Sequence, residues 1–276
     1  MNYLEKINEA RDFVKSVSNF KPTIGLILGS GLGSFADEIE KADRIKYCDI
    51  PHFPVSTVEG HDGKLVLGEL HGKMVVAMKG RVHFYEGYSM REITFPVRVM
   101  RALGIKSLIV TNACGGINEK LYPGALMFIN DHINFTGSNP LIGDNFEELG
   151  SRFPDMTTAY DPNLISIGKA AASELQIETF EGVHTAVSGP YYLSKAELRM
   201  IQSFGSDTIG MSTIPEVIVA NHGGIRSLGI CCITDKANPH NEIEPLDHER
   251  VVDVANRTRP KFIKLVSKII EKLPSS

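Results

Sequence analysis

Residues 23–33 read TIGLILGSGLG and join an apolar run to a glycine-rich loop. The run from Thr23 to Leu28 is apolar on both faces, which is typical of a strand buried within a parallel sheet. In the loop, glycines at positions 29, 31 and 33 let backbone N–H groups approach an anion, and Ser30 adds a hydroxyl. A tight turn would use the same glycines. The loop by itself therefore indicates an anion site and a simple turn equally well.

The loop does not complete a longer nucleotide-binding motif. A dinucleotide fingerprint needs glycine or alanine at position 34, a closing βαβ unit and an acid about 20 residues further on. Here Ser34 occupies that position, and Pro51 and Pro54 follow. The patterns G-x-x-x-x-G-K-[ST] and G-x-S-x-G do not occur, which excludes a P-loop and a hydrolase nucleophile elbow.

Short apolar runs alternate with amphipathic segments outward from this stretch. We expect a hairpin formed by residues 64–69 and 74–79 around His71-Gly72. Further strands are expected at residues 107–111, 126–134, 182–187, 208–210 and 227–234, and helices at residues 2–17, 91–103, 162–175, 194–204, 214–222 and from Asp247 onward, with a bend at Pro260. The alternation predicts an α/β fold: a single domain over residues 1–276, with a mixed, largely parallel central sheet flanked by helices.

The composition is that of a globular protein, with 42% hydrophobic and 22% charged residues among 276. No segment approaches the roughly 18 uninterrupted apolar residues of a membrane span, so we expect no membrane partner. Lys and Arg total 29 against 33 Asp and Glu, for a net charge of -4. Because this charge provides no basic field for a phosphate backbone, we expect no nucleic acid partner.

The cysteines and histidines indicate a reduced protein without a metal. The N-terminus lacks the pattern of an export signal, and the cysteines at 48, 114, 231 and 232 include no C-x-x-C pair. Cys114 and the Cys231-Cys232 pair lie in apolar stretches, as reduced core thiols do, so we expect a cytoplasmic protein. None of the nine histidines forms H-E-x-x-H or another close ligand pair, and no metal site is expected.

Polar donors follow several of the expected strands. Residues 80–87 read GRVHFYEG, directly after the second strand of the hairpin. In an extended segment Arg81, His83 and Tyr85 would point to one face, because side chains alternate with period two. An arginine fork beside an imidazole and a phenol suits a phosphate and an adjoining hydroxylated ligand. A solvated strand edge is the competing interpretation.

Two more strand ends carry small residues or a hydroxyl. Residues 111–116 read TNACGG, which allows close approach to the backbone at Ala113, although a packed turn would look the same. Ser212 comes directly before an expected helix N-terminus, where the helix dipole favours an anion and where an ordinary N-cap is also common. Ligands of α/β folds bind where strands end in loops. We therefore expect these donors, with Ser30, Arg81 and His83, to converge on one phosphate.

Taken in order, these stretches, with Glu59-Gly60-His61, Gly189-Pro190 and residues 246–249, resemble the trimeric purine nucleoside phosphorylases over essentially the whole chain. The resemblance implies a homotrimer of single α/β domains with active sites near the interfaces. It also implies purine salvage by reversible phosphorolysis of purine (2'-deoxy)ribonucleosides to the free base and (2-deoxy)ribose 1-phosphate. Phosphate is the co-substrate and no cofactor is expected. The transition state would resemble the oxocarbenium ion of glycoside hydrolysis, with phosphate as the acceptor in place of water.

The resemblance also assigns roles to individual residues. Matched to phosphate contacts are Ser30, His61, Arg81, His83, Ala113 and Ser212, and matched to nucleoside contacts are Tyr85, Tyr192, Met211, Asp235, His248 and, from a neighbouring subunit, Phe153. The residues expected to take part in catalysis are His83, Asp235 and Glu86, with Glu86 orienting the phosphate-binding groups.

Two positions depart from the family pattern, and both concern the base. Leu193 follows Tyr192 where the family has glutamate, and Asp235 follows Thr234 where it has asparagine. An aspartate accepts from a 6-amino group and, when protonated, donates to purine N7, so discrimination against adenosine would be weaker. Alternatively, inosine and guanosine remain preferred through contacts from the following loop, at Asn238, His240, Asn241, Glu242 and Glu244.

Two other functions remain open at the level of sequence. A 5'-methylthioadenosine phosphorylase also uses an aspartate near the base, whereas His248 favours a 5'-hydroxyl over a thiomethyl group. A non-catalytic nucleoside- or dinucleotide-binding module would use only the loop at residues 29–33. That function leaves the face formed by Arg81, His83 and Tyr85 unexplained.

Overall fold

A computed structural model of the chain describes residues 1–29, 31–57, 62–237, 239 and 248–274. Within these residues the strands are β1 (Ile24–Leu28), β2 (Glu40–Lys46), β3 (Lys64–Leu70), β4 (Lys73–Lys79), β5 (Ser107–Gly116), β6 (Leu126–Phe135), β7 (Thr179–Val187), β8 (Thr208–Gly210) and β9 (Arg226–Lys236). They form one mixed sheet in the order β2-β3-β4-β1-β5-β8-β7-β6-β9, in which β5 also pairs with β9. The expected α/β fold with a mixed central sheet is confirmed.

The apolar run at the start of the chain forms the centre of this sheet. All five residues of β1 are buried, and β1 pairs in parallel with β4 on one side and β5 on the other. The expected hairpin is also present, because β3 and β4 are antiparallel and turn at His71 and Gly72, both of which have positive φ.

Five strands close into a ring. β5 pairs with β8, β8 with β7, β7 with β6, β6 with β9, and β9 again with β5. The strands β1, β4, β3 and β2 extend from β5 as an open wing. Only β5 belongs to both parts, so its last residues lie where the loops after β1 and β4 meet the ring.

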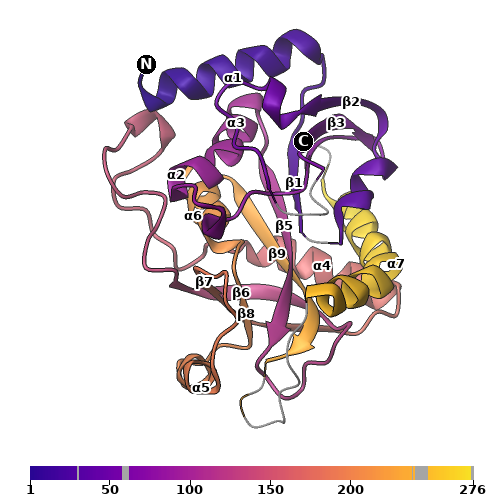
Figure 1. Cartoon of the computed structure of the whole chain (residues 1–276). Coiled ribbons are helices and arrows are strands. Elements are labelled where there is room, and N and C mark those ends of the chain that lie inside the picture. Colours follow the sequence, from indigo (N-terminus) through magenta and orange to yellow (C-terminus); the bar gives the residue numbers. More distant parts are fainter. Residues whose placement is uncertain (30, 58–61, 238, 240–247, 275–276) are drawn as a thin grey trace.

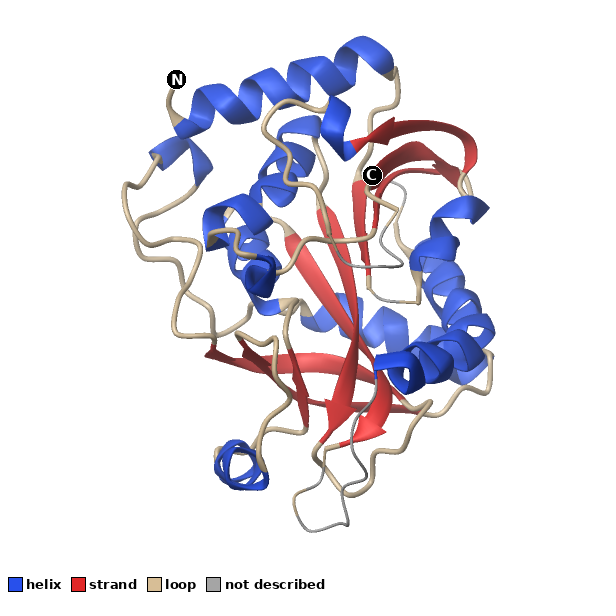
Figure 2. Cartoon of the chain, in the orientation of Figure 1, coloured by secondary structure: helices blue, strands red, loops and turns tan. Residues whose placement is uncertain are grey.

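Helices cover the sheet on both sides (Figures 1 and 2). The α-helices are α1 (Tyr3–Val17), α2 (Met90–Ile93), α3 (Phe95–Leu103), α4 (Pro162–Glu174), α5 (Lys195–Ser203), α6 (Ile214–His222) and α7 (His248–Lys272), and the short 3₁₀ helices are η1 (Gly33–Glu38), η2 (Tyr47–Asp49), η3 (Phe84–Glu86) and η4 (Glu147–Leu149). α3 packs between α1 and α6, whereas α4 and α7 pack against each other and against β9. None of the helices in the described ranges combines the length and apolar character of a membrane span.

Three local expectations were wrong. The helix expected at residues 91–103 is two helices, α2 and α3, which meet at Thr94. Pro96 explains the break, because proline has no N–H to continue the helical hydrogen bonds. β5 continues to Gly116 instead of ending at Thr111, because β9 pairs with it along its whole length. β2 was not expected, since its largely exposed, charged sequence EKADRIK lacks an apolar alternation.

Candidate active site

A cavity of about 150 Å³ lies at the carboxyl ends of β1, β4, β5, β8 and β9. This is where ligands bind in α/β folds. The cavity is lined by eight of the residues expected from the sequence, namely Arg81, His83, Tyr85, Ala113, Tyr192, Met211, Ser212 and Asp235. Segments distant along the chain therefore meet at one place, as the convergence of donors predicted.

The remaining expected residues are not among the described residues that line the cavity. Ser30 and His61 fall outside the described residues, and His248 begins α7 with its side chain outside the description. Phe153 does not line the cavity of its own chain, and 88% of its surface is exposed. Glu86 contacts His83, which does line it.

Arg81, which lines the cavity, is held by buried partners. Its guanidinium pairs with the Glu216 carboxylate at 3.1 Å, and the two side chains are 2% and 5% exposed. It also donates to Thr213 Oγ1 at 3.2 Å and to the Thr111 carbonyl. Burial lowers the pKa of Arg81, and the charge of Glu216 opposes that shift. The guanidinium is thus fixed in place before any ligand arrives.

Glu216 was not among the residues expected to form the site. It lies in the first turn of α6 and is the one acid in a helix whose other residues are mostly buried and apolar. An acid in such a helix is a signal for a buried ion pair, because a buried carboxylate without a partner is costly.

His83 is oriented by Glu86. The Glu86 carboxylate accepts from the His83 backbone N–H at 2.6 Å and lies 3.2 Å from Nδ1 of the ring. It also accepts from the backbone and hydroxyl of Thr57. Burial would raise the pKa of Glu86, but these hydrogen bonds, led by His83, lower it to about 2. Because an ionised carboxylate only accepts, Nδ1 carries the proton of this contact.

Tyr85 stacks on His83 with ring centroids 4.8 Å apart. Burial and the nearby Glu86 charge raise the pKa of Tyr85 to about 12, so the phenol stays neutral and can donate. The segment is not extended throughout, as the sequence analysis assumed. It enters η3 at Phe84, and the three side chains nevertheless reach the same cavity.

The loop after β1 passes very close to β5. A Cβ on Gly29 would lie 2.9 Å from both the Cα of Asn112 and the carbonyl oxygen of Thr111, so only glycine fits there. The Gly29 N–H donates to the hydroxyl of Thr111. Asn112, a lining residue that the sequence analysis did not single out, donates to Thr213 Oγ1 and to His184 Nε2. These contacts fix the loop, β5 and the start of α6 relative to one another.

Asp235 lies near the end of β9 and lines the cavity. Burial raises its pKa, and a hydrogen bond from Thr234 at 3.0 Å opposes the shift. A Cβ on Gly115 would lie 2.9 Å from Asp235 Oδ2, so the glycine makes room for this carboxyl group. Leu193 also lines the cavity, whereas Glu197 forms a capping box with Ser194 at the start of α5.

Comparisons with known proteins agree with this geometry. Residues 23–271 match the phosphorylase superfamily. The chain is 55% identical over 266 residues to purine nucleoside phosphorylase 1 of Bacillus subtilis, covering 96% of this chain and 98% of that protein. Among solved structures, isoform 2 of the Schistosoma mansoni purine nucleoside phosphorylase, in complex with cytosine and ribose-1-phosphate, has a TM-score of 0.94 at 43% identity, covering 99% of this chain and 98% of that one. The Schistosoma mansoni enzyme in complex with inosine has a TM-score of 0.94 at 36% identity, with the same coverage. The chain therefore belongs to the phosphorylase superfamily, as one of its purine nucleoside phosphorylases.

Proposed function

We propose that this enzyme carries out reversible phosphorolysis of purine (2'-deoxy)ribonucleosides, with inosine and guanosine as substrates and with tolerance of adenosine. One observation carries the proposal: Arg81, His83 and Ser212 meet in one cavity with Tyr85 and Asp235. The first three are donors suited to a phosphate, and the last two are suited to a nucleoside. A cavity with phosphate donors beside nucleoside-binding residues would hold ligands such as the ribose-1-phosphate and the inosine bound by the Schistosoma mansoni enzymes.

The geometry supports a reaction without a protein nucleophile. A phosphate oxygen forms a bond to the anomeric carbon of the ribose as the bond from that carbon to purine N9 breaks. The bonding electron pair leaves with the base, and a protonated Asp235 would deliver its proton to N7. The protein contributes by positioning phosphate and ribose and by stabilising charge in the transition state. The names of the relatives favour this activity over phosphorolysis of methylthioadenosine.

The proposal is tested by incubating the enzyme with inosine and following release of hypoxanthine, with and without inorganic phosphate. We expect release only with phosphate, together with stoichiometric ribose 1-phosphate. Base release in phosphate-free buffer would instead indicate hydrolysis and would refute phosphorolysis.

Substitutions at His83 and Glu86 test the phosphate face. His83→Ala should lower affinity for phosphate and turnover together, because the imidazole would face the phosphate dianion. Loss of one charge-assisted donor costs about 1.5 to 3 kcal/mol, or roughly 10- to 150-fold in kcat/KM for phosphate. Glu86→Gln should give a smaller loss of the same kind, because glutamine can donate to Nδ1 and stabilise the wrong tautomer. Wild-type saturation by phosphate in both variants would show that His83 and Glu86 do not contribute to phosphate binding.

We further propose that three copies of residues 1–276, each a single domain, form a homotrimer in the cytoplasm. The exposed Phe153 ring, with the Arg152 guanidinium 5.9 Å from its centroid, would then cover the ribose site of a neighbouring subunit. Cytoplasmic location is supported by Cys48, Cys114, Cys231 and Cys232, none of which forms a disulfide.

Phe153→Ala tests the shared site. The variant should raise KM for the nucleoside more than KM for phosphate, because only the ribose would lose a contact. Sedimentation at the assay concentration provides the mass of the active species. A fully active monomer would contradict both the trimer and the role of Phe153.

A further inference from the structure

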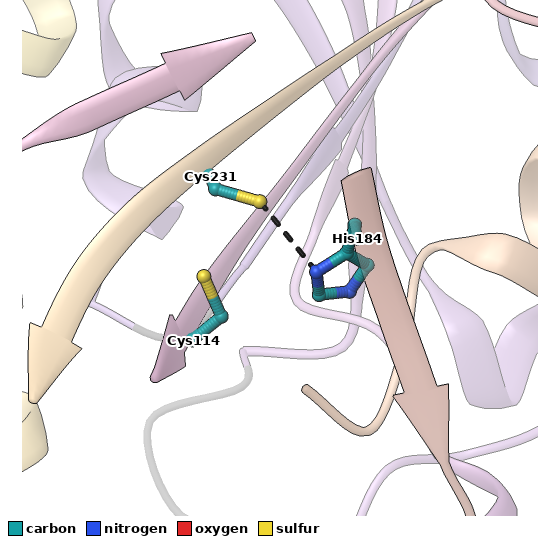
Figure 3. Close-up of side chains that lie close together, drawn as sticks. All are labelled: Cys114, His184 and Cys231. Carbon is teal, nitrogen blue, oxygen red and sulfur yellow. Dashed lines mark hydrogen bonds between the residues drawn. The ribbon is translucent and has the colours of Figure 1, made fainter. Parts of the chain in front are cut away.

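Three side chains that the proposed reaction does not use converge inside the ring of strands. Cys114 comes from β5, His184 from β7 and Cys231 from β9. All three are buried, and the two sulfurs and a ring nitrogen lie within 4.8 Å of one another. Figure 3 shows both sulfurs and the His184 ring turned toward a common region, with His184 Nδ1 3.8 Å from the Cys231 sulfur.

These distances are close to those of a metal site. Zinc bonds of about 2.3 Å to sulfur and 2.0 to 2.1 Å to nitrogen place tetrahedral ligand atoms roughly 3.5 to 3.8 Å apart. The Cys231 to His184 pair already has such a separation. The remaining pairs, which are at most 4.8 Å apart, need to close by about 1.3 Å at most, which is within the reach of small side-chain rotations.

The chemistry of the ligand set selects the class of metal. Thiolates and imidazole bind Zn²⁺ and Cu⁺, whereas Mg²⁺ and Ca²⁺ prefer carboxylate and carbonyl oxygens. Binding of such a cation would displace the thiol protons, because cysteine binds a metal as the thiolate.

A neighbouring amide can support the histidine. Metal-binding histidines donate their second ring N–H to an oxygen. Asn112 Nδ2 lies 3.2 Å from His184 Nε2, while the buried Asn112 Oδ1 has no partner among the described residues. Half a turn of the amide would let Oδ1 accept from Nε2–H, with the Thr213 hydroxyl becoming the donor in its contact with Asn112. A cation at Nδ1 would then replace the hydrogen bond that Nδ1 makes with Thr208 Oγ1 at 2.9 Å.

The cluster is also accessible from the active site, because Cys114 lines the cavity. We propose that Cys114, His184 and Cys231 bind one soft d¹⁰ cation, Zn²⁺ or Cu⁺, which enters through the cavity. The three side chains leave the fourth ligand position for a water, as in open zinc sites. A bound cation would join β5, β7 and β9 directly beneath the base.

Cadmium serves as a spectroscopic probe for this site. A Cys48→Ser background removes the exposed thiol, which could otherwise bind cadmium on its own. Titration of this reduced protein with Cd²⁺ in phosphate-free buffer should produce a thiolate-to-cadmium absorption band that saturates at one equivalent per chain. Adding Cys231→Ala should abolish the band. Adding Cys232→Ala should leave it unchanged, because that neighbouring buried thiol is outside the cluster.

The proposal is overturned if no band forms in the Cys48→Ser protein, or if the band survives Cys231→Ala. Should Cys231→Ala fail to fold, ¹¹³Cd NMR of the Cys48→Ser protein decides the question. A chemical shift typical of two sulfur ligands supports the site, and a shift typical of oxygen ligands alone refutes it.

Discussion

Replacing Arg81 with methionine should lower the free energy of unfolding by about 3 to 5 kcal/mol, because it leaves the buried Glu216 carboxylate without its partner. Activity should be lost as well, since the proposed phosphate site would lose its arginine. The double variant Arg81→Met/Glu216→Leu separates these effects. Replacing a buried ion pair by apolar side chains of similar volume is often nearly neutral for stability. The double variant should therefore regain most of its stability without regaining saturation by phosphate.

Arg98 offers a matched control for this experiment. It is also a buried arginine, 4% exposed, and it donates to the Leu149 carbonyl away from the cavity. Arg98→Met should destabilise the protein in urea unfolding but leave KM for phosphate unchanged. A double variant at Arg81 and Glu216 with wild-type phosphate kinetics would show that Arg81 only stabilises the fold.

Asp235→Ala should reduce kcat for inosine by roughly 10²- to 10⁴-fold, the usual contribution of a general acid. The physical reason is that burial raises the pKa of Asp235, which favours the protonated form that would donate to N7 of the leaving base. Single-turnover measurements with saturating phosphate isolate this step. A variant that retains the wild-type rate of glycosidic bond cleavage would rule out proton donation by Asp235.

The same carboxyl group gives the reaction a pH dependence of known sign. Because the pKa is raised, the protonated form persists to a higher pH than in an ordinary aspartate and is lost as the pH rises through the shifted value. Activity should therefore fall across that range in the wild type. Asp235→Asn should remove this titration and raise the inosine-to-adenosine ratio of kcat/KM, because an amide and a carboxyl group differ toward a 6-amino substituent. An unchanged ratio would mean that Asp235 does not determine base choice.

The sequence predicted those parts of the fold that follow from local patterns. The apolar run of β1, the His71-Gly72 hairpin and α6 each depend on residues close together in the chain. The full length of β5 depends instead on pairing with β9, more than 100 residues away, and no local signal reports it. β2 was missed for a related reason: an edge strand with charged residues resembles a loop.

The candidate site shows the same difference between residues marked by local motifs and residues brought together by the fold. Donor motifs at strand ends predicted Arg81, His83 and Ser212, and the family resemblance added Asp235. The topology of the mixed sheet brings the four residues to one cavity. Glu216 was overlooked because nothing in a linear motif states which buried charges will face each other. The Cys114, His184 and Cys231 cluster escaped notice for the same reason. Its members are 70 and 47 residues apart, so no ligand spacing marks them.

The closed ring of strands also has a consequence during synthesis. β9, which begins at residue 226 of 276, completes the ring by pairing with both β5 and β6. A ribosome adds about 5 to 20 residues per second, so the nascent chain carries β5 and β6 with unpaired backbone groups for several seconds or more. Such open strand edges are templates for aggregation. The emerging polypeptide is therefore exposed to misassembly and to chaperone capture until β9 has left the ribosome.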